Sequence, residues 1–180
     1  LTDRIAEGIL KSTIEAGRIA DREPDNYEAR ATLMWAGSLS HNGLTSAGRS
    51  FLMQVHQMEH ELSGMYPQIA HGAGLSALWP SWARYVCAAW PERFAQYAVR
   101  VWNLEMNFEN PMETALAGIK VTEDYFKSLN MPVRLSDLEA DVKEEDFDEM
   151  AEKCTNFGRR VLPGIRELGK HEMMDIYRMA

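Results

Sequence analysis

The chain has 180 residues, 46% of them hydrophobic and 26% charged, which is typical of a soluble globular protein. Its formal net charge of -8 repels phosphate backbones and argues against nucleic acid as a partner. No apolar run is long enough to span a bilayer and no secretory signal pattern is present, so we expect a cytoplasmic protein without a membrane anchor.

The sequence pattern before residue 42 predicts two helices. Thr2 and Asp3 open a first helix, in which apolar residues recur at helical spacing, namely Ile5, Ile9, Leu10 and Ile14. A second helix is expected to begin at Asp25, because Glu28 stands three positions later in a capping-box arrangement. Residues 42–48 form a polar, glycine-bearing loop.

A third helix is expected from Ser50, with an apolar set made of Phe51, Val55, Leu62 and Met65. Pro67 marks its end, because proline cannot continue the hydrogen-bond ladder of a helix. An apolar helical segment follows over residues 70–86, and Pro80 is expected to kink or divide it.

Pro91 and Pro111 are typical first-turn prolines of two further helices, the second with Asn110 as its N-cap. A short acidic helix over 143–154 and a last helix over 170–179 complete the chain. Strand patterns are missing, and with them the βαβ unit of a dinucleotide fold. The sequence therefore predicts an all-α helical bundle in a single domain, residues 1–180.

Three of the five histidines, His56, His60 and His71, lie within sixteen residues. His56 and His60 are four positions apart, so on a helix their side chains share one face about 5–6 Å apart. Imidazole is the commonest neutral ligand of first-row divalent metals. His71 stands past a proline at the next helix start and could fold back to that face. This spacing favours a metal site, and solvated or structural histidines are the alternative.

The same stretch supports a rival interpretation. Residues 56–60 match H-x-x-E-H, the signature of inverted zinc proteases, with His56 and His60 on the metal and Glu59 as general base. The motif is short and arises often by chance, so spacing by itself leaves both alternatives open.

Several consecutive blocks are more specific than either histidine pair. They are EARATLMWA (28–36), NGL (42–44), VHQMEHELS (55–63), AHGAGL (70–75) with Pro80 and Trp82, and the C-terminal residues 168–180. Together they resemble the iron-containing alcohol dehydrogenases, the NADPH-dependent butanol-dehydrogenase branch above all. The resemblance runs the length of the chain and implies the helical metal-binding C-terminal domain of that family, a fold of the dehydroquinate synthase type.

The resemblance assigns roles to the three histidines. In that family one aspartate and three histidines hold a divalent ion; His56 matches the third ligand and His71 the fourth, whereas His60 matches a histidine that relays protons near the nicotinamide and the substrate. It also implies Fe(II), or else Zn(II), with NADP(H) or NAD(H) in the full-length enzyme. The metal would act as Lewis acid on the oxygen of an alcohol during hydride transfer, in a homodimer. Glu59 and Glu61 are expected on the helix surface, and Pro67-Gln68 is the expected place of one extra residue.

Other parts of the family pattern are missing. Its first two ligands form Asp-x-x-x-His, and no aspartate in this sequence has a histidine four positions later. The glycine-rich pyrophosphate loop is missing too, and the first residue is Leu1 rather than methionine. We therefore expect an excised piece without the N-terminal nucleotide-binding domain, inactive by itself on alcohols or aldehydes. A non-catalytic helical scaffold is the alternative from another functional class.

The remaining candidates favour ordinary structural roles. Cys87 and Cys154 are expected to be buried reduced thiols, which fits a reducing compartment. His41 and His171 are expected to be structural or solvated. Six apolar residues near the histidines could line an alcohol pocket, although core packing is more typical of such residues: Leu62, Met65, Leu75, Leu78, Trp79 and Trp82.

Overall fold

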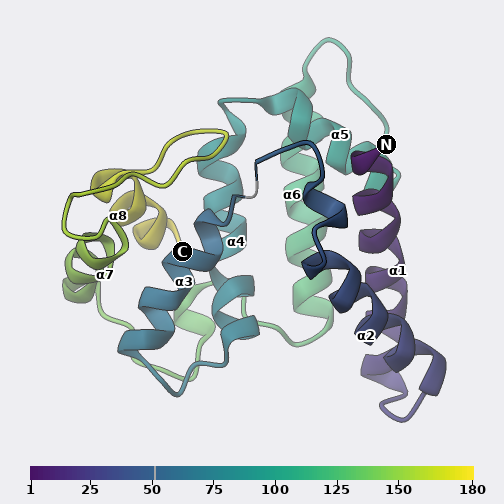
Figure 1. The fold of residues 1–180 in the computed structure, drawn as a ribbon, viewed down its shortest axis with the longest axis horizontal. Coiled ribbons are helices and arrows are strands. Elements are labelled where there is room, and N and C mark those ends of the chain that lie inside the picture. The colour runs from purple at the N-terminus through teal and green to yellow at the C-terminus, as the bar shows by residue number, and fades with distance from the viewer. Residues whose placement is uncertain (51) are drawn as a thin grey trace.

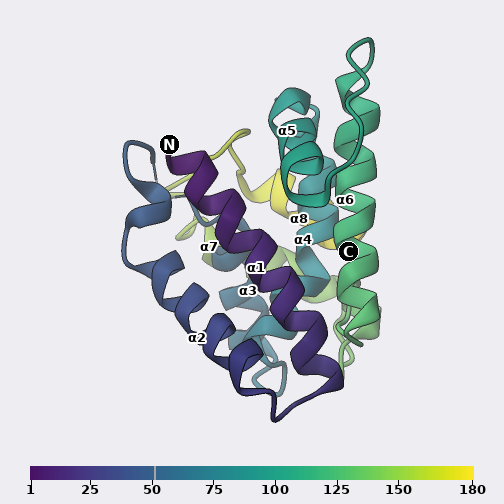
Figure 2. The same ribbon diagram turned by 90° about the vertical axis from the view of Figure 1, so that its right-hand side faces the viewer.

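The computed structural model describes residues 1–50 and 52–180 (Figures 1 and 2). Within this part of the chain the regular structure consists of eight α-helices and three short 3-10 helices. Extended segments pair there at one isolated bridge, between Leu162 and Leu168. The predicted all-α fold is confirmed. Among the described helices, none combines the length and the apolar character needed to cross a membrane.

Helices α1 (Thr2–Arg22) and α2 (Tyr27–His41) pack against each other at one side of the molecule, as Figure 2 shows. The Asn26 side chain accepts a hydrogen bond of 3.0 Å from the backbone N–H of Ala29. Asn26 is therefore the N-cap of α2, and the expectation of Asp25 with a capping box to Glu28 was wrong. An asparagine cap uses its own amide oxygen, so the helix begins two residues later than expected. The loop that follows contains η1 (Leu44–Ser46).

Helix α3 (Gln54–Met65) begins four residues later than the predicted Ser50, and Phe51 lies outside the described residues. Gln54 explains this start. Its buried side-chain amide N donates to the carbonyl oxygens of Leu162 (3.0 Å) and Arg166 (2.7 Å). Gln54 thus ties the first turn of α3 to the loop that precedes the last helix, and it cannot be shifted along the helix without breaking both bonds.

A turn of five residues that contains Pro67 joins α3 to α4 (His71–Cys87), and the two helices pack against each other. Pro67 lies two residues after the end of α3, so the helix ends just before it, as predicted. Pro80 lies inside α4 and does not divide it. Helix α4 also packs against the last helix and against α6, so it connects the two sides of the molecule seen in Figure 1.

Helices α5 (Pro91–Trp102) and α6 (Pro111–Ser128) form an extensively packed pair, and both begin with the predicted first-turn proline. Their close approach depends on a glycine. A Cβ atom at Gly118 would lie only 2.4 Å from the Cβ of Ala98, a distance that real side chains do not reach. The small residues at this crossing therefore fix how near the two helix axes can come.

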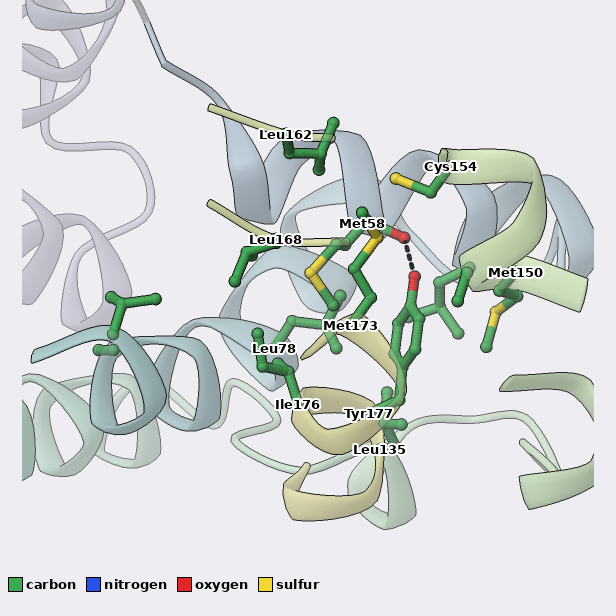
Figure 3. Packing of buried hydrophobic residues seen from close by; sticks show 14 of the residues in the cluster. Met58, Leu78, Leu135, Met150, Cys154, Leu162, Leu168, Met173, Ile176 and Tyr177 are labelled. Atoms are coloured by element: carbon green, nitrogen blue, oxygen red, sulfur yellow. Dashed lines mark hydrogen bonds between the residues drawn. The ribbon is translucent and has the colours of Figure 1, made fainter. Parts of the chain in front are cut away.

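The C-terminal part contains η2 (Leu135–Asp137), η3 (Glu144–Asp146), α7 (Phe147–Cys154) and α8 (Lys170–Met179). The predicted helix over 143–154 is a 3-10 turn followed by an α-helix, and the predicted last helix is confirmed at both ends. Side chains from α3, α4, α7 and α8 meet in the core drawn in Figure 3, where the Tyr177 hydroxyl donates to the carbonyl oxygen of Met58. The Tyr177 ring also stacks on that of Phe147.

Cys87 and Cys154 end α4 and α7, and both are free and buried, as predicted. Burial raises the pKa of Cys154 to about 11 and raises the pKa of Cys87 as well. Because the thiolate is the reactive form, we expect neither thiol to react with Ellman's reagent in the native protein at about pH 8. Both should react after unfolding in guanidinium. Rapid labelling of either cysteine in the folded protein would contradict this burial.

Candidate metal centre

Two histidines lie on one face of α3. His56 and His60 are one helical turn apart, and their ring centroids are 4.6 Å from each other. Helix geometry alone produces this proximity, because residues at i and i+4 project to the same side. The sequence prediction for this pair is confirmed in its geometry.

The third histidine arrives from the following helix. His71 is the first residue of α4, and its ring centroid lies 4.4 Å from that of His56 and 5.3 Å from that of His60. The turn that brings it back is anchored by Tyr66, whose hydroxyl donates to Asp146 and accepts the backbone N–H of Lys143 at 3.1 Å. The chain therefore folds His71 over the face that carries His56 and His60, as its position after the proline suggested.

The three imidazoles form a donor set suited to a metal ion. One ring nitrogen from each of His56, His60 and His71 lies within 4.8 Å of the other two. Burial lowers the pKa of His56, and the neighbouring rings of His71 and His60 lower it further. A neutral imidazole offers a free lone pair, and such donors suit first-row divalent ions such as Fe(II) and Zn(II). The residues present thus fit a metal of this kind.

The cluster opens to solvent on one side. His56 is half-buried, whereas His60 and His71 are exposed. An open hollow of about 350 Å³ lies beside His56 and His60, and its other lining residues are Leu52, Met53, Gln57 and Pro163. A small molecule could therefore reach the ring nitrogens from this side without a rearrangement of α3 or α4.

Glu59 does not lie on the helix surface, and that expectation was wrong. Its side chain is 0% exposed, and one carboxylate oxygen is hydrogen-bonded to Nδ1 of His71. The reason is the packing of α3 on α4, which turns Glu59 inward toward Gly74. The spacing in the sequence shows only that Glu59 shares a face of α3 with His56 and that Gly74 shares a face of α4 with His71, not that these faces meet. Glu61, the other glutamate placed on the surface, is half-buried.

Five of the six apolar candidates divide into two groups, and the sixth, Leu75, is half-buried on α4. Leu62 and Leu78 are fully buried core residues, and Met65 packs against that core, as core packing predicted. Trp79 and Trp82 instead line a cavity of about 470 Å³, whose other residues come mainly from α1, α5 and α6. None of the three clustered histidines lines this cavity, so the two tryptophans belong to a separate feature of the fold.

The two other histidines are not members of the donor set, although His41 also contributes to lowering the pKa of His56. His41 ends α2, and its Nδ1 is 3.0 Å from the carbonyl oxygen of Gly37. On α8, His171 is exposed, and its Nε2 lies 3.5 Å from the Asp175 carboxylate. Within the described residues the hydrogen-bond and ion-pair partners of both are local, which fits the structural or solvated roles expected for them.

Comparison with known proteins gives one consistent result. The profile of the Fe-containing alcohol dehydrogenase family, C-terminal, matches residues 1–180. NADH-dependent butanol dehydrogenase B of Clostridium acetobutylicum is 39% identical over 180 residues, which are 99% of this chain and 45% of that protein. NADPH-dependent aldehyde reductase YqhD of Escherichia coli is 37% identical over 144 residues, 76% of this chain and 35% of that protein.

Solved structures agree in fold. NADH-dependent butanol dehydrogenase A of Thermotoga maritima superimposes with a TM-score of 0.89 at 31% identity, over 99% of this chain and 46% of that one. The substrate- and cofactor-free form of E. coli YqhD superimposes with a TM-score of 0.88 at 31% identity, over 98% of this chain and 45% of that one. The chain spans less than half the length of these relatives.

Proposed function

Because this chain belongs to the iron-containing alcohol dehydrogenase family, we propose that it is the metal-binding half of an NAD(P)-dependent oxidoreductase that interconverts alcohols and aldehydes. The convergence of His56, His60 and His71 from two helices is the observation that carries the proposal. Relatives named as butanol dehydrogenases and as an aldehyde reductase support a small alcohol or aldehyde as the substrate.

His56 and His71 are the proposed metal ligands. Their ring centroids are the nearest pair of the cluster, at 4.4 Å, and they come from two helices that are packed against each other. Such a pair is held in place by the fold itself, which keeps both imidazoles ready for one ion. A bound Fe(II) or Zn(II) supplies Lewis acidity toward the substrate oxygen, and the nicotinamide supplies the hydride chemistry.

His60 is the proposed proton relay. Its ring lies farther from His71 than that of His56 does, and its exposed side chain lines the hollow beside the cluster. An imidazole can both accept and donate a proton, so a ring in this position can pass a proton between the site and solvent. Its place one turn beyond His56 keeps it next to the ligands while leaving its ring open to water.

The zinc-hydrolase interpretation fits the geometry poorly. It needs the Glu59 carboxylate to act as general base on a water molecule next to the metal. Glu59 is instead buried, with one oxygen bound to His71 and the other enclosed beside Gly74. A carboxylate without access to substrate or solvent cannot take up and release protons during turnover.

The proposal is tested with the full product of the gene that contains this chain. We expect it to reduce butanal with NADH or NADPH, to lose this activity when a chelator removes the metal, and to regain it with Fe(II) or Zn(II). Spectrophotometric assay of nicotinamide oxidation measures the rate, and elemental analysis measures the metal. The isolated 180-residue chain should show no turnover. Full activity of the metal-free protein would contradict the proposal, whereas a helical scaffold would show neither metal nor activity.

A further inference from the structure

One acidic side chain beside the histidines has no part in the function proposed above. Glu59 lies on α3 with 0% of its side chain exposed, and among the described residues its one hydrogen-bond partner is Nδ1 of His71. The His71 side chain is 44% exposed. The buried carboxylate therefore contacts the inner edge of an imidazole whose other side faces solvent. This arrangement leaves Nε2 as the nitrogen of His71 that is free to bind a ligand.

Gly74 provides the space that Glu59 occupies. A Cβ atom built at Gly74 would lie 2.5 Å from Oε1 of Glu59, 2.7 Å from its Cγ and 3.0 Å from its Cδ. Within the described residues this Oε1 is buried and has no hydrogen-bond partner. The carboxyl group therefore fills a slot that exists only because residue 74 has no side chain.

We propose that Glu59 is a positioning residue for His71, and that Gly74 is glycine in order to admit it. The proposal rests on the proposed metal site. The carboxylate accepts the Nδ1–H of His71, which fixes one tautomer and orientation of the ring and leaves Nε2 on the side of the ring away from Glu59. Such partners behind a ligating histidine raise its basicity and hold its direction.

Energetics favours this role over simple packing. A buried carboxylate with one oxygen unpartnered destabilises a fold compared with an apolar residue of similar size. Neither the core nor helix propensity requires a charge at this position, and Met or Leu would fill the slot between α3 and Gly74. A nearby divalent cation would offset the negative charge of the carboxylate. The metal site therefore explains why a glutamate stands at this position, and the packing of α3 on α4 does not.

The test uses the full-length enzyme and compares Glu59→Met, Glu59→Gln and the control Glu61→Gln. Affinity for Zn(II) is measured by competition with a chromogenic chelator, and the visible spectrum of the Co(II)-substituted protein reports the ligand geometry. We expect Glu59→Met to weaken metal binding about 10- to 100-fold, as for other lost partners of ligating histidines. Glu59→Gln keeps an oxygen acceptor for Nδ1–H and should recover part of the loss. Glu61→Gln, on the same helix, should leave affinity and spectrum unchanged.

A second pair of variants covers the case in which Glu59→Met does not fold. Gly74→Ala should displace the carboxylate and weaken metal binding, whereas Gly72→Ala, whose Cβ meets nothing within 4 Å, should not. Thermal unfolding of the metal-free proteins separates a loss of fold from a loss of affinity. A folded Glu59→Met or Gly74→Ala enzyme with unchanged Zn(II) affinity would overturn the proposal. An unaltered enzyme that binds no metal would overturn the proposed function, and this inference with it.

Discussion

Replacing His56 or His71 with alanine in the full-length enzyme is expected to lower metal content and activity together. Each change removes one imidazole from a cluster whose ring nitrogens lie within 4.8 Å, and water then takes the vacated position. His71→Ala should also destabilise the protein more than His56→Ala does, because it leaves the buried Glu59 carboxylate without its partner. Elemental analysis, steady-state kinetics and thermal unfolding of the same preparations measure the three effects.

His60→Ala should behave differently from the two ligand variants. If His60 relays protons, the metal stays bound while kcat falls by about 10²- to 10⁴-fold, the range for lost general acid–base assistance. His171→Ala is a matched control, since this exposed histidine lies on α8 away from the cluster. Loss of metal from His60→Ala together with its retention in His71→Ala would refute the ligand assignment.

Much of the fold follows from local signals in the sequence. Pro91 and Pro111 each begin a helix, and the ends of α8 fall where they were predicted. The errors occur where a distant residue or a competing cap decides the boundary. Gln54 begins α3 because its amide meets two carbonyl oxygens more than a hundred residues away, and no local pattern contains that information.

In the candidate site, too, local features were predictable from the sequence and features that depend on the packing of two helices were not. The spacing of His56 and His60 determines their proximity, and the turn before His71 made its return to the same face foreseeable. Glu59 was misplaced because a glutamate within a helix is usually exposed. Its burial depends on which face of α3 meets α4 and on the absence of a side chain at Gly74, and both are properties of the packed helix pair rather than of either helix alone.

Tyr177 connects the C-terminal helix to the helix that carries the histidines (Figure 3). Its hydroxyl donates a 2.8 Å hydrogen bond to the carbonyl oxygen of Met58, which lies between His56 and His60 in the sequence of α3. The ring stacks on Phe147 of α7 at a centroid distance of 5.5 Å. Burial raises the pKa of Tyr177 well above its ordinary value, so the phenol stays neutral and remains a donor.

We therefore expect Tyr177→Ala to lower the free energy of unfolding by about 3–5 kcal/mol, the cost of a cavity left by a buried aromatic ring. The side chain is 1% exposed and contacts Met58 of α3 and Phe147 of α7, so collapse of the vacated space would require these helices to move. Tyr177→Phe keeps the ring and loses only the hydrogen bond, for which about 1 kcal/mol is expected. Urea titrations followed by circular dichroism measure both values.

Tyr27→Ala, at a residue 78% exposed, is the control and should change the free energy of unfolding by about 0.5 kcal/mol or less. Equal losses for Tyr177→Ala and Tyr27→Ala would contradict the placement of Tyr177 in the core, and equal losses for Tyr177→Phe and Tyr177→Ala would assign its whole effect to the bond with Met58.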